Sequence, residues 1–298
     1  MAKSKSFFGL RRGSTKSLTF SVLNGQQVTK DRVYGGKNPR SMAQMVQRMC
    51  MATSSAGYQA MKQIVDHSFE GVSYGANTMA KFLSVNTKAL KDAYNGGSDK
   101  FAFNPYGDRG LKLGEYIMSQ GSASQIIAVG LTPQRAAHGV GMKIAVSGTG
   151  GTTATNLFNT LGIAVGDLCT FCFMYALDGS AEDWKFGFIR LTALQAGDTV
   201  LTAGNISTYV KIESNLGNVA TSIVDSDITM ILTVADDATD ILDLPYCAIH
   251  SVHSNGAWLR STTKLIVPGT AEIAPSAQDA IATYPVGESY VLNGGEIE

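Results

Sequence analysis

Hydrophobic and polar positions follow two different patterns along the chain, and the pattern changes at about residue 110. The front part begins with alternating residues on either side of Asn24-Gly25, the strongest short signal for a two-residue type I′ hairpin turn. With these two residues as the turn, the predicted cross-strand pairs are Leu23 with Gln26, Ser21 with Val28, Thr19 with Lys30, and Ser17 with Arg32.

This register sorts the side chains of the hairpin onto two faces, because alternate residues of a strand point to opposite sides. Lys30 and Arg32 fall on one polar face, whereas the other face carries Leu18, Phe20, Val22 and Val33. We therefore expect a hairpin that is docked on one side and basic on the other.

Helical spacing follows the hairpin. Asn38-Pro39 is typical of a helix N-cap and first helical position, and an apolar stripe at helical spacing follows it at Met42, Met45, Val46 and Met49. A second helix is predicted from about Asn77 to a glycine stop at Gly96-Gly97.

The second part is built of short segments such as LCTFCFMYAL and DITMILTV, which are rich in β-branched and aromatic residues and are separated by Gly, Asp or Asn. This pattern predicts an antiparallel sandwich or barrel of roughly seven to nine strands, with one helix at 152–162. Three of the seven prolines follow from residue 268 onward, which is typical of an extended arm packed on this protein or on a neighbour.

The predicted fold class is α+β, a β-hairpin plus helices followed by a mainly antiparallel β-domain. The predicted divisions are a basic N-terminal arm (1–17), a basic hairpin-plus-helices domain (18–95), a linker (96–112), a β-rich domain (113–267) and a C-terminal arm (268–298).

The net charge of zero hides a strong asymmetry. Residues 1–65 hold 11 Lys and Arg against the single anion Asp31, a net charge of +10, so that residues 66–298 carry −10. Such asymmetry indicates a partner for the basic part, either nucleic acid or the acidic part of a neighbouring copy. The candidate contact residues are Arg11, Arg12, Lys16, Lys30, Arg32, Lys37, Arg40 and Arg48, and the candidate acidic counter-surface is Asp236, Asp237, Asp240 and Asp243. Few aromatic residues lie among the cations, which favours contact with the phosphate backbone over base recognition.

Composition limits the compartment and the class of protein. The longest strongly apolar run, residues 168–177, is about half the length that a membrane-spanning helix needs. The N-terminus lacks the longer apolar region of a secretory signal, and four Cys suit buried thiols in a reducing compartment. We expect no membrane span and a location in the cytoplasm before assembly, or in a virion.

Candidate catalytic and metal motifs are weak. The Gly-rich stretch 147–156 lacks the Lys of a phosphate-binding loop. Cys169 and Cys172 lie three apart in one apolar strand and so point to opposite faces, and Cys247, His250 and His253 are separated in the same way. We expect no metal, no cofactor and no enzymatic activity, since spacing places no pair of titratable residues for acid–base work.

Several motifs together carry a resemblance. The runs NGQQV (24–28), NPR (38–40), Gln44, Gln47 and Arg48, and NGAWLRS (255–261) resemble a family of uncharacterised proteins encoded by gut Bacteroidetes, their prophages and mobile elements. The resemblance covers residues 18–90 well, brings no enzymatic activity with it, and implies a phage or mobile-element context.

Three functions remain open from the sequence. The first is a self-assembling structural protein of a phage or phage-derived particle, a coat or virion component that contacts copies of itself. The second is a nucleic-acid-binding accessory protein of a mobile element, and the third is an attachment or adhesion protein.

Overall fold

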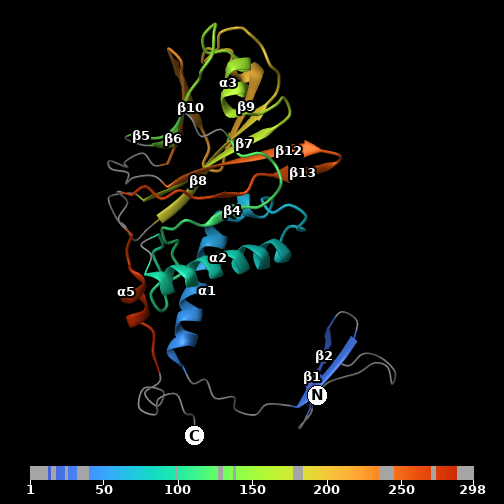
Figure 1. Cartoon of the computed structure of the whole chain (residues 1–298), viewed down its shortest axis with the longest axis vertical. Coiled ribbons are helices and arrows are strands. Elements are labelled where there is room, and N and C mark those ends of the chain that lie inside the picture. The colour runs from blue at the N-terminus through green and yellow to red at the C-terminus, as the bar shows by residue number, and fades with distance from the viewer. Residues whose placement is uncertain are drawn as a thin grey trace. The chain divides into compact units, whose positions relative to one another are not determined.

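The computed structural model describes residues 13–14, 18–23, 26–31, 40–97, 100–126, 130–136, 139–176, 184–234, 245–269 and 273–286. The chain divides into two units, one formed by residues 1–41 with 287–298 and the other by residues 42–286 (Figure 1). The predicted α+β class is confirmed: a hairpin, a few helices and antiparallel sheets are present, and the described strands form no closed barrel.

The first unit contains a three-stranded antiparallel sheet in the order β1-β2-β3. Its strands are β1 (Gly13–Ser14), β2 (Leu18–Leu23) and β3 (Gln26–Asp31). The pairs Leu23 with Gln26, Ser21 with Val28 and Thr19 with Lys30 form as predicted, whereas the pair Ser17 with Arg32 lies outside the described residues. Strand β1 was not predicted, because two residues are too few to show alternation.

The second unit has three layers. Helices α1 (Met42–Val65) and α2 (Ala76–Gly96) cover one face of a five-stranded sheet, and a four-stranded sheet covers the other face (Figure 1). The five-stranded sheet runs in the order β13 (Ala257–Arg260), β12 (Tyr246–Ser254), β7 (Leu168–Ala176), β8 (Trp184–Ala193) and β9 (Val210–Ser214). The four-stranded sheet runs in the order β10 (Val219–Val224), β11 (Asp227–Thr233), β6 (Gly139–Ala145) and β5 (Leu131–Ala136).

Strand β7 explains the long apolar run at 168–177. Cys172 and Met174 face the helical layer, whereas Cys169, Phe171 and Phe173 face the four-stranded sheet. Both faces of β7 are therefore buried, and a strand buried on both faces is apolar throughout instead of alternating. The expected placement of Cys169 and Cys172 on opposite faces is confirmed.

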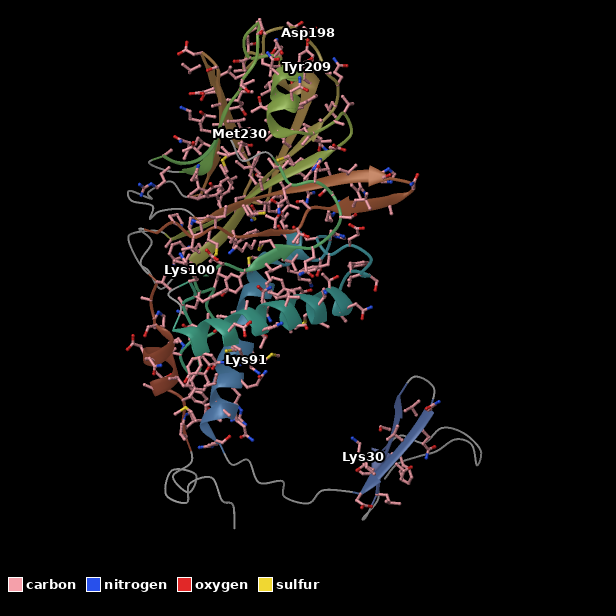
Figure 2. The ribbon with its side chains drawn as sticks, viewed as in Figure 1. Lys30, Lys91, Lys100, Asp198, Tyr209 and Met230 are labelled. Carbon is pink, nitrogen blue, oxygen red and sulfur yellow. The ribbon has the colours of Figure 1, made fainter. Side chains whose placement is uncertain are left out.

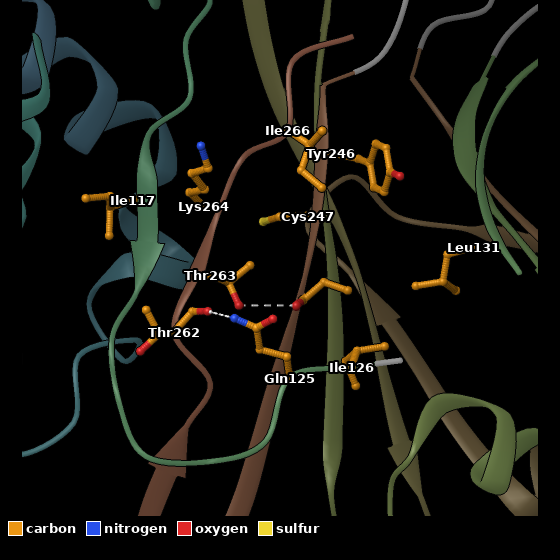
Figure 3. Close-up of a pocket in the computed structure, with 11 residues that line it drawn as sticks. Ile117, Gln125, Ile126, Leu131, Tyr246, Cys247, Thr262, Thr263, Lys264 and Ile266 are labelled. Atoms are coloured by element: carbon orange, nitrogen blue, oxygen red, sulfur yellow. Dashed lines mark hydrogen bonds between the residues drawn. The ribbon is translucent and has the colours of Figure 1, made fainter. Parts of the chain in front are cut away.

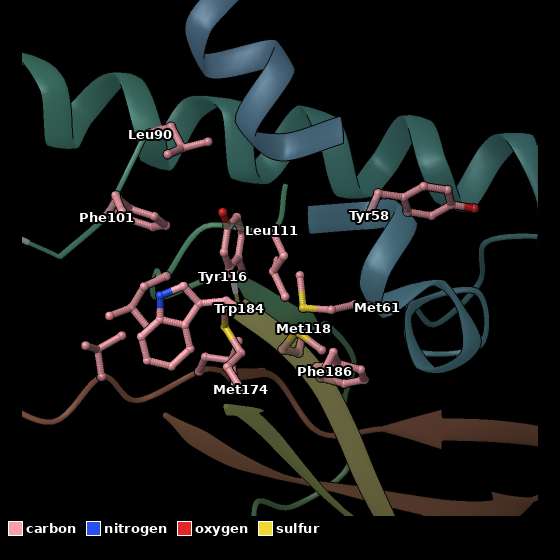
Figure 4. Packing of buried hydrophobic residues seen from close by; sticks show 14 of the residues in the cluster. Tyr58, Met61, Leu90, Phe101, Leu111, Tyr116, Met118, Met174, Trp184 and Phe186 are labelled. Atoms are coloured by element: carbon pink, nitrogen blue, oxygen red, sulfur yellow. The ribbon is translucent and has the colours of Figure 1, made fainter. Parts of the chain in front are cut away.

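A core of aromatic and methionine side chains joins the helices to the sheet. Tyr116 is fully buried between Phe82 of α2 and Phe101, and Met174 and Trp184 close the cluster from the sheet side (Figure 4). Residues 101–104, 111 and 112 of the expected linker are buried. The predicted domain boundaries themselves stay a prediction.

Shorter elements complete the second unit. Helix α2 ends at Gly97 in the left-handed conformation (φ 62°), as predicted. Helix α3 (Ala154–Leu161) occupies the predicted segment and is capped by Thr153. Strand β4 (Ile117–Ser119) pairs with β14 (Thr263–Lys264), and α4 spans Ile206–Tyr209. Within the predicted C-terminal arm, residues 273–286 contain α5 (Ala277–Ala282). This helix packs in the helical core through Ala280 and Ile281.

Candidate functional site

The N-terminal sheet separates apolar and basic side chains as the sequence predicts. Leu18, Phe20 and Val22 form an apolar row on one face of β2, and their partners on the same face of β3 are the exposed Gln27, Thr29 and Asp31. Lys30 lies opposite Thr19 on the other face (Figure 2). Lys30 is exposed, whereas the three apolar side chains are half-buried, and no side chain described in β2 or β3 is fully buried.

Two other predicted contact residues fall within the described part of the chain. Arg40 is exposed and adopts a left-handed backbone conformation (φ 49°) just before α1. Arg48 lies on the exposed side of α1, where its Nη1 is 3.9 Å from the Sδ atom of Met45. The remaining cations (Arg11, Arg12, Lys16, Arg32 and Lys37) and the acidic set (Asp236, Asp237, Asp240 and Asp243) lie outside the described residues, so the counter-surface stays a prediction. Asn38-Pro39, the predicted helix start, lies outside them too.

Arg48 lines a cavity of about 420 Å³ between α1, the 105–110 segment and the end of α5. Arg109, Tyr106 and Tyr284 line it with Arg48. The carboxylate of Asp108 in its wall is paired with Lys112 Nζ at 2.7 Å and accepts from the Gly110 N–H at 2.8 Å. The structure thus brings Arg48 together with a second arginine that sequence spacing did not single out.

A second cavity, of about 290 Å³, lies beside β4, β12 and β14 (Figure 3). Its polar lining groups are engaged within the chain: Gln125 Nε2 donates to the Thr262 carbonyl (2.8 Å), and Lys264 Nζ is 2.6 Å from Glu115 Oε2. Cys247 is buried, and the hydrogen bond with the Cys172 thiol, together with burial, raises the pKa of the Cys247 thiol well above its ordinary value. The polar groups around this cavity are therefore already bonded within the chain, and we assign no ligand site to it.

A buried His–Asp pair escaped the sequence reasoning. His250 Nε2 lies 3.1 Å from Asp167 Oδ2, and both residues are buried. The other ring nitrogen, Nδ1, lies 2.9 Å from the Ser124 carbonyl oxygen and 3.3 Å from its hydroxyl oxygen. Asp167 is 83 positions away from His250, so no local motif could have indicated the pair. Both ring nitrogens of His250 face acceptors. These contacts connect strand β12 to the residue before β7 and to the segment after β4.

The remaining motifs form no catalytic constellation in the described residues. Cys247 and His250 are buried on β12, and His253 is exposed and contacts the Trp258 ring at 5.1 Å. No group of three His, Cys, Asp or Glu in the described part of the chain could hold a metal ion. The Gly-rich stretch forms the loop before α3, and Asn156 Nδ2 donates to the carbonyls of Thr149 and Gly151 within that loop.

A further cluster gathers between the α1–α2 loop and the β12–β13 hairpin. Tyr74, Trp258 and Arg260 line a cavity of about 410 Å³ there, together with the carboxyl groups of Asp66 and Glu70. We call it the loop–hairpin pocket. Trp258 and Arg260 belong to the NGAWLRS motif, for which the sequence predicts no site, since the α1–α2 loop is almost two hundred residues away in the chain.

Comparison of the chain with models of protein families, with curated proteins and with solved structures finds no match. Among the described residues, no helix has the length and apolar character needed to cross a membrane.

Proposed function

We propose that the chain is a non-enzymatic structural protein of a phage or phage-derived particle, a coat or virion component that assembles with copies of itself. The observation that carries the proposal is the N-terminal sheet, which belongs to a unit separate from the three-layered body and has an apolar row on one face. The motifs that resemble proteins of Bacteroidetes prophages and mobile elements support the particle context.

A sheet of three short strands needs a second layer. A single sheet buries an apolar face only against another element, and two or three strands alone are marginal in water. Leu18, Phe20 and Val22 are only half-buried, and β3 has no neighbouring strand on its outer edge in the described sheet. A neighbouring copy could supply both the second layer and the missing strand, because exposed strand edges pair readily.

Charge favours the same kind of contact. Residues 1–65 carry +10 and residues 66–298 carry −10. Opposed charges on one chain attract the front of one copy to the body of the next, and a heterologous contact of this kind extends into rings or larger assemblies.

The test uses the full-length protein and two neighbouring substitutions. Phe20→Asp places a charge in the apolar row, whereas Thr19→Asp places the same charge on the opposite face of the same strand. We expect the wild type and Thr19→Asp to form oligomers or particles in light scattering and electron microscopy, and Phe20→Asp to remain monomeric. A wild-type protein that stays monomeric at high concentration in moderate salt would refute the proposal.

The second candidate, a nucleic-acid-binding accessory protein, is favoured by the exposed Lys30 on the polar face of the hairpin and by the +10 charge of the front part. It predicts salt-sensitive, sequence-tolerant binding through phosphates. Binding should be lost when Lys30, Arg32, Arg40 and Arg48 are changed to Ala together, and unchanged binding by this variant would exclude it.

A further inference from the structure

The loop–hairpin pocket has the composition of a ligand site. Pockets that bind small molecules combine aromatic surface with a few well-placed polar groups. Here Tyr74 is 73% exposed and Trp258 is 41% exposed, although large aromatic side chains usually lie inside a protein. Both line the same cavity of about 410 Å³, so that their exposure is concentrated at one place.

Neighbouring side chains hold the two rings in position. The Tyr74 ring stacks on His67, with 5.7 Å between centroids and 28° between planes. The Arg260 guanidinium carbon lies 5.1 Å from the centre of the Trp258 ring, and the His253 ring is at 5.1 Å as well. Such contacts fix ring orientation before a ligand arrives, which lowers the entropy cost of binding.

Arg260 presents an unused donor. Its Nε donates to the His67 carbonyl at 2.7 Å, but its Nη1 is buried and has no hydrogen-bond partner among the described residues. A buried donor without a partner destabilises the fold, so it calls for an explanation. Because Nη1 is closed to solvent in this structure, a ligand hydroxyl gains this donor only when the Arg260 guanidinium turns toward the cavity that the residue lines.

Carboxyl groups give the pocket acceptors as well. Glu70 accepts from the Ser122 N–H (2.8 Å) and hydroxyl (3.0 Å), and this backbone N–H holds the pKa of Glu70 below its usual value. Asp66 Oδ1 accepts from the Tyr58 hydroxyl at 2.5 Å. Each carboxyl group has further lone pairs beyond these bonds.

The combination fits a neutral saccharide. A sugar ring offers an apolar C–H face to an aromatic ring and hydroxyl groups that both donate and accept hydrogen bonds. We propose that the loop–hairpin pocket binds a neutral saccharide, stacked on Tyr74 or Trp258 and bonded to Arg260 Nη1 and to the carboxyl groups of Asp66 and Glu70. Single-stranded nucleic acid also stacks on aromatic rings, but two carboxyl groups beside one guanidinium disfavour a phosphate chain.

The inference does not rest on self-assembly, because the pocket lies within the three-layered body and Phe20 lies in the other unit. The Phe20→Asp protein is therefore expected to keep the site. Its loss of assembly and its retention of saccharide binding are separate outcomes, so that failure of one proposal leaves the other standing.

The first experiment screens the full-length protein on an array of neutral oligosaccharides, with sialylated and sulfated glycans and oligodeoxythymidine as acidic probes. Several pockets in an assembled particle would raise the apparent affinity through multivalency. We expect binding to neutral glycans. The absence of neutral-glycan binding, or binding to the acidic probes alone, overturns the proposal.

The second experiment titrates the best-bound neutral oligosaccharide by calorimetry. Loss of one stacking ring should weaken binding by about tenfold or more, so Tyr74→Ala and Trp258→Ala are the test variants. Tyr106→Ala is the matched control, since Tyr106 is a 62% exposed tyrosine that does not line this pocket. Equal affinities for all three variants would overturn the site assignment.

A spectroscopic readout separates binding from folding. The chain has two tryptophans, of which Trp184 is buried and Trp258 is in the pocket. Saccharide binding should shift the emission of the wild-type protein to the blue, and Trp258→Phe should abolish this shift while its circular dichroism stays unchanged. A shift that persists in Trp258→Phe would contradict the proposal.

Discussion

The side-chain amide of Asn86 in α2 forms hydrogen bonds with the backbone of Ile117 in β4, as a neighbouring strand would. The side chain is fully buried, its Oδ1 accepts from the Ile117 N–H at 2.8 Å, and its Nδ2 donates to the Ile117 carbonyl at 3.2 Å. Nδ2 also donates to the Phe82 carbonyl at 3.1 Å. One amide thus satisfies both backbone groups of Ile117 and fixes β4 on the helical layer.

The expected cost of removing this amide follows from the groups that lose their partner. In Asn86→Ala the Ile117 N–H and carbonyl are both left without it, at about 1–3 kcal/mol for each buried group, so we expect a loss of about 2–6 kcal/mol. The Phe82 carbonyl adds little, since it can keep its bond within the helix. Urea unfolding followed by circular dichroism measures the difference, and hydrogen exchange should show lost protection at the Ile117 amide.

Asn86→Asp tests the orientation of the amide. The carboxylate can still accept from the Ile117 N–H, but its second oxygen faces two carbonyl oxygens in a buried site. We expect Asp to be at least as destabilising as Ala at neutral pH. Acidification should narrow the deficit, because a protonated carboxyl group can donate. Asn95→Ala, an exposed position on the same helix, is the control and should cost little. An Asp variant as stable as the wild type would refute the assigned bonds.

Three further outcomes are expected. Asp167→Asn removes the charged partner of His250 and should cost about 1.5–3 kcal/mol in chemical unfolding; a change within error would show that the pair contributes nothing. Gly141→Ala should destabilise the four-stranded sheet, because the added methyl group would overlap the Met230 carbonyl oxygen; an unchanged melting temperature would contradict that packing. Burial raises the pKa of the Cys50 thiol from 9.0 to about 11, so stability from this group is complete below pH 9 and is lost as pH rises toward 11; a thiol reagent that labels Cys50 in the native protein at pH 8 would disprove its burial.

The parts of the fold that local pattern determines were predictable. Asn24-Gly25 determines the register of the hairpin, Gly97 ends α2 where the glycine signal indicates, and α3 lies within the predicted segment 152–162. Strand β10 and the short β4 were not predicted. Residues 219–224 alternate only weakly and 117–119 are too few for a period, so tertiary pairing decides both.

The candidate sites depended on contacts that no local pattern encodes. His250 meets Asp167 across the fold, and Trp258 and Tyr74 line the same pocket from segments that are distant in the sequence. Spacing within β12 correctly indicated that Cys247, His250 and His253 do not gather on one helical face. It could not indicate which residues from other elements face each of them, because those neighbours are set by the packing of the layers.

The NGAWLRS motif can be divided by what each residue does in the fold. Asn255 and Gly256 adopt the positive φ angles of the turn, the Arg260 carbonyl accepts from the Ala123 N–H, and the buried Ser261 hydroxyl accepts from the His250 N–H. Folding therefore accounts for Asn255, Gly256 and Ser261, and for the backbone of Arg260. Trp258 differs, since it is 41% exposed and its contacts with Arg260 and His253 are at the surface.

A structural role for Trp258 and a binding role make different predictions. An exposed cation–π contact contributes about 0.5–1 kcal/mol, so Trp258→Ala should reduce the free energy of unfolding by no more than about that amount if the ring serves binding. A buried tryptophan would cost about 3–5 kcal/mol. Unfolding of Trp258→Ala in urea, beside Trp184→Ala as the buried counterpart, decides between the two. A loss for Trp258→Ala as large as that for Trp184→Ala would assign the ring to the fold and remove the main reason for a ligand in the pocket.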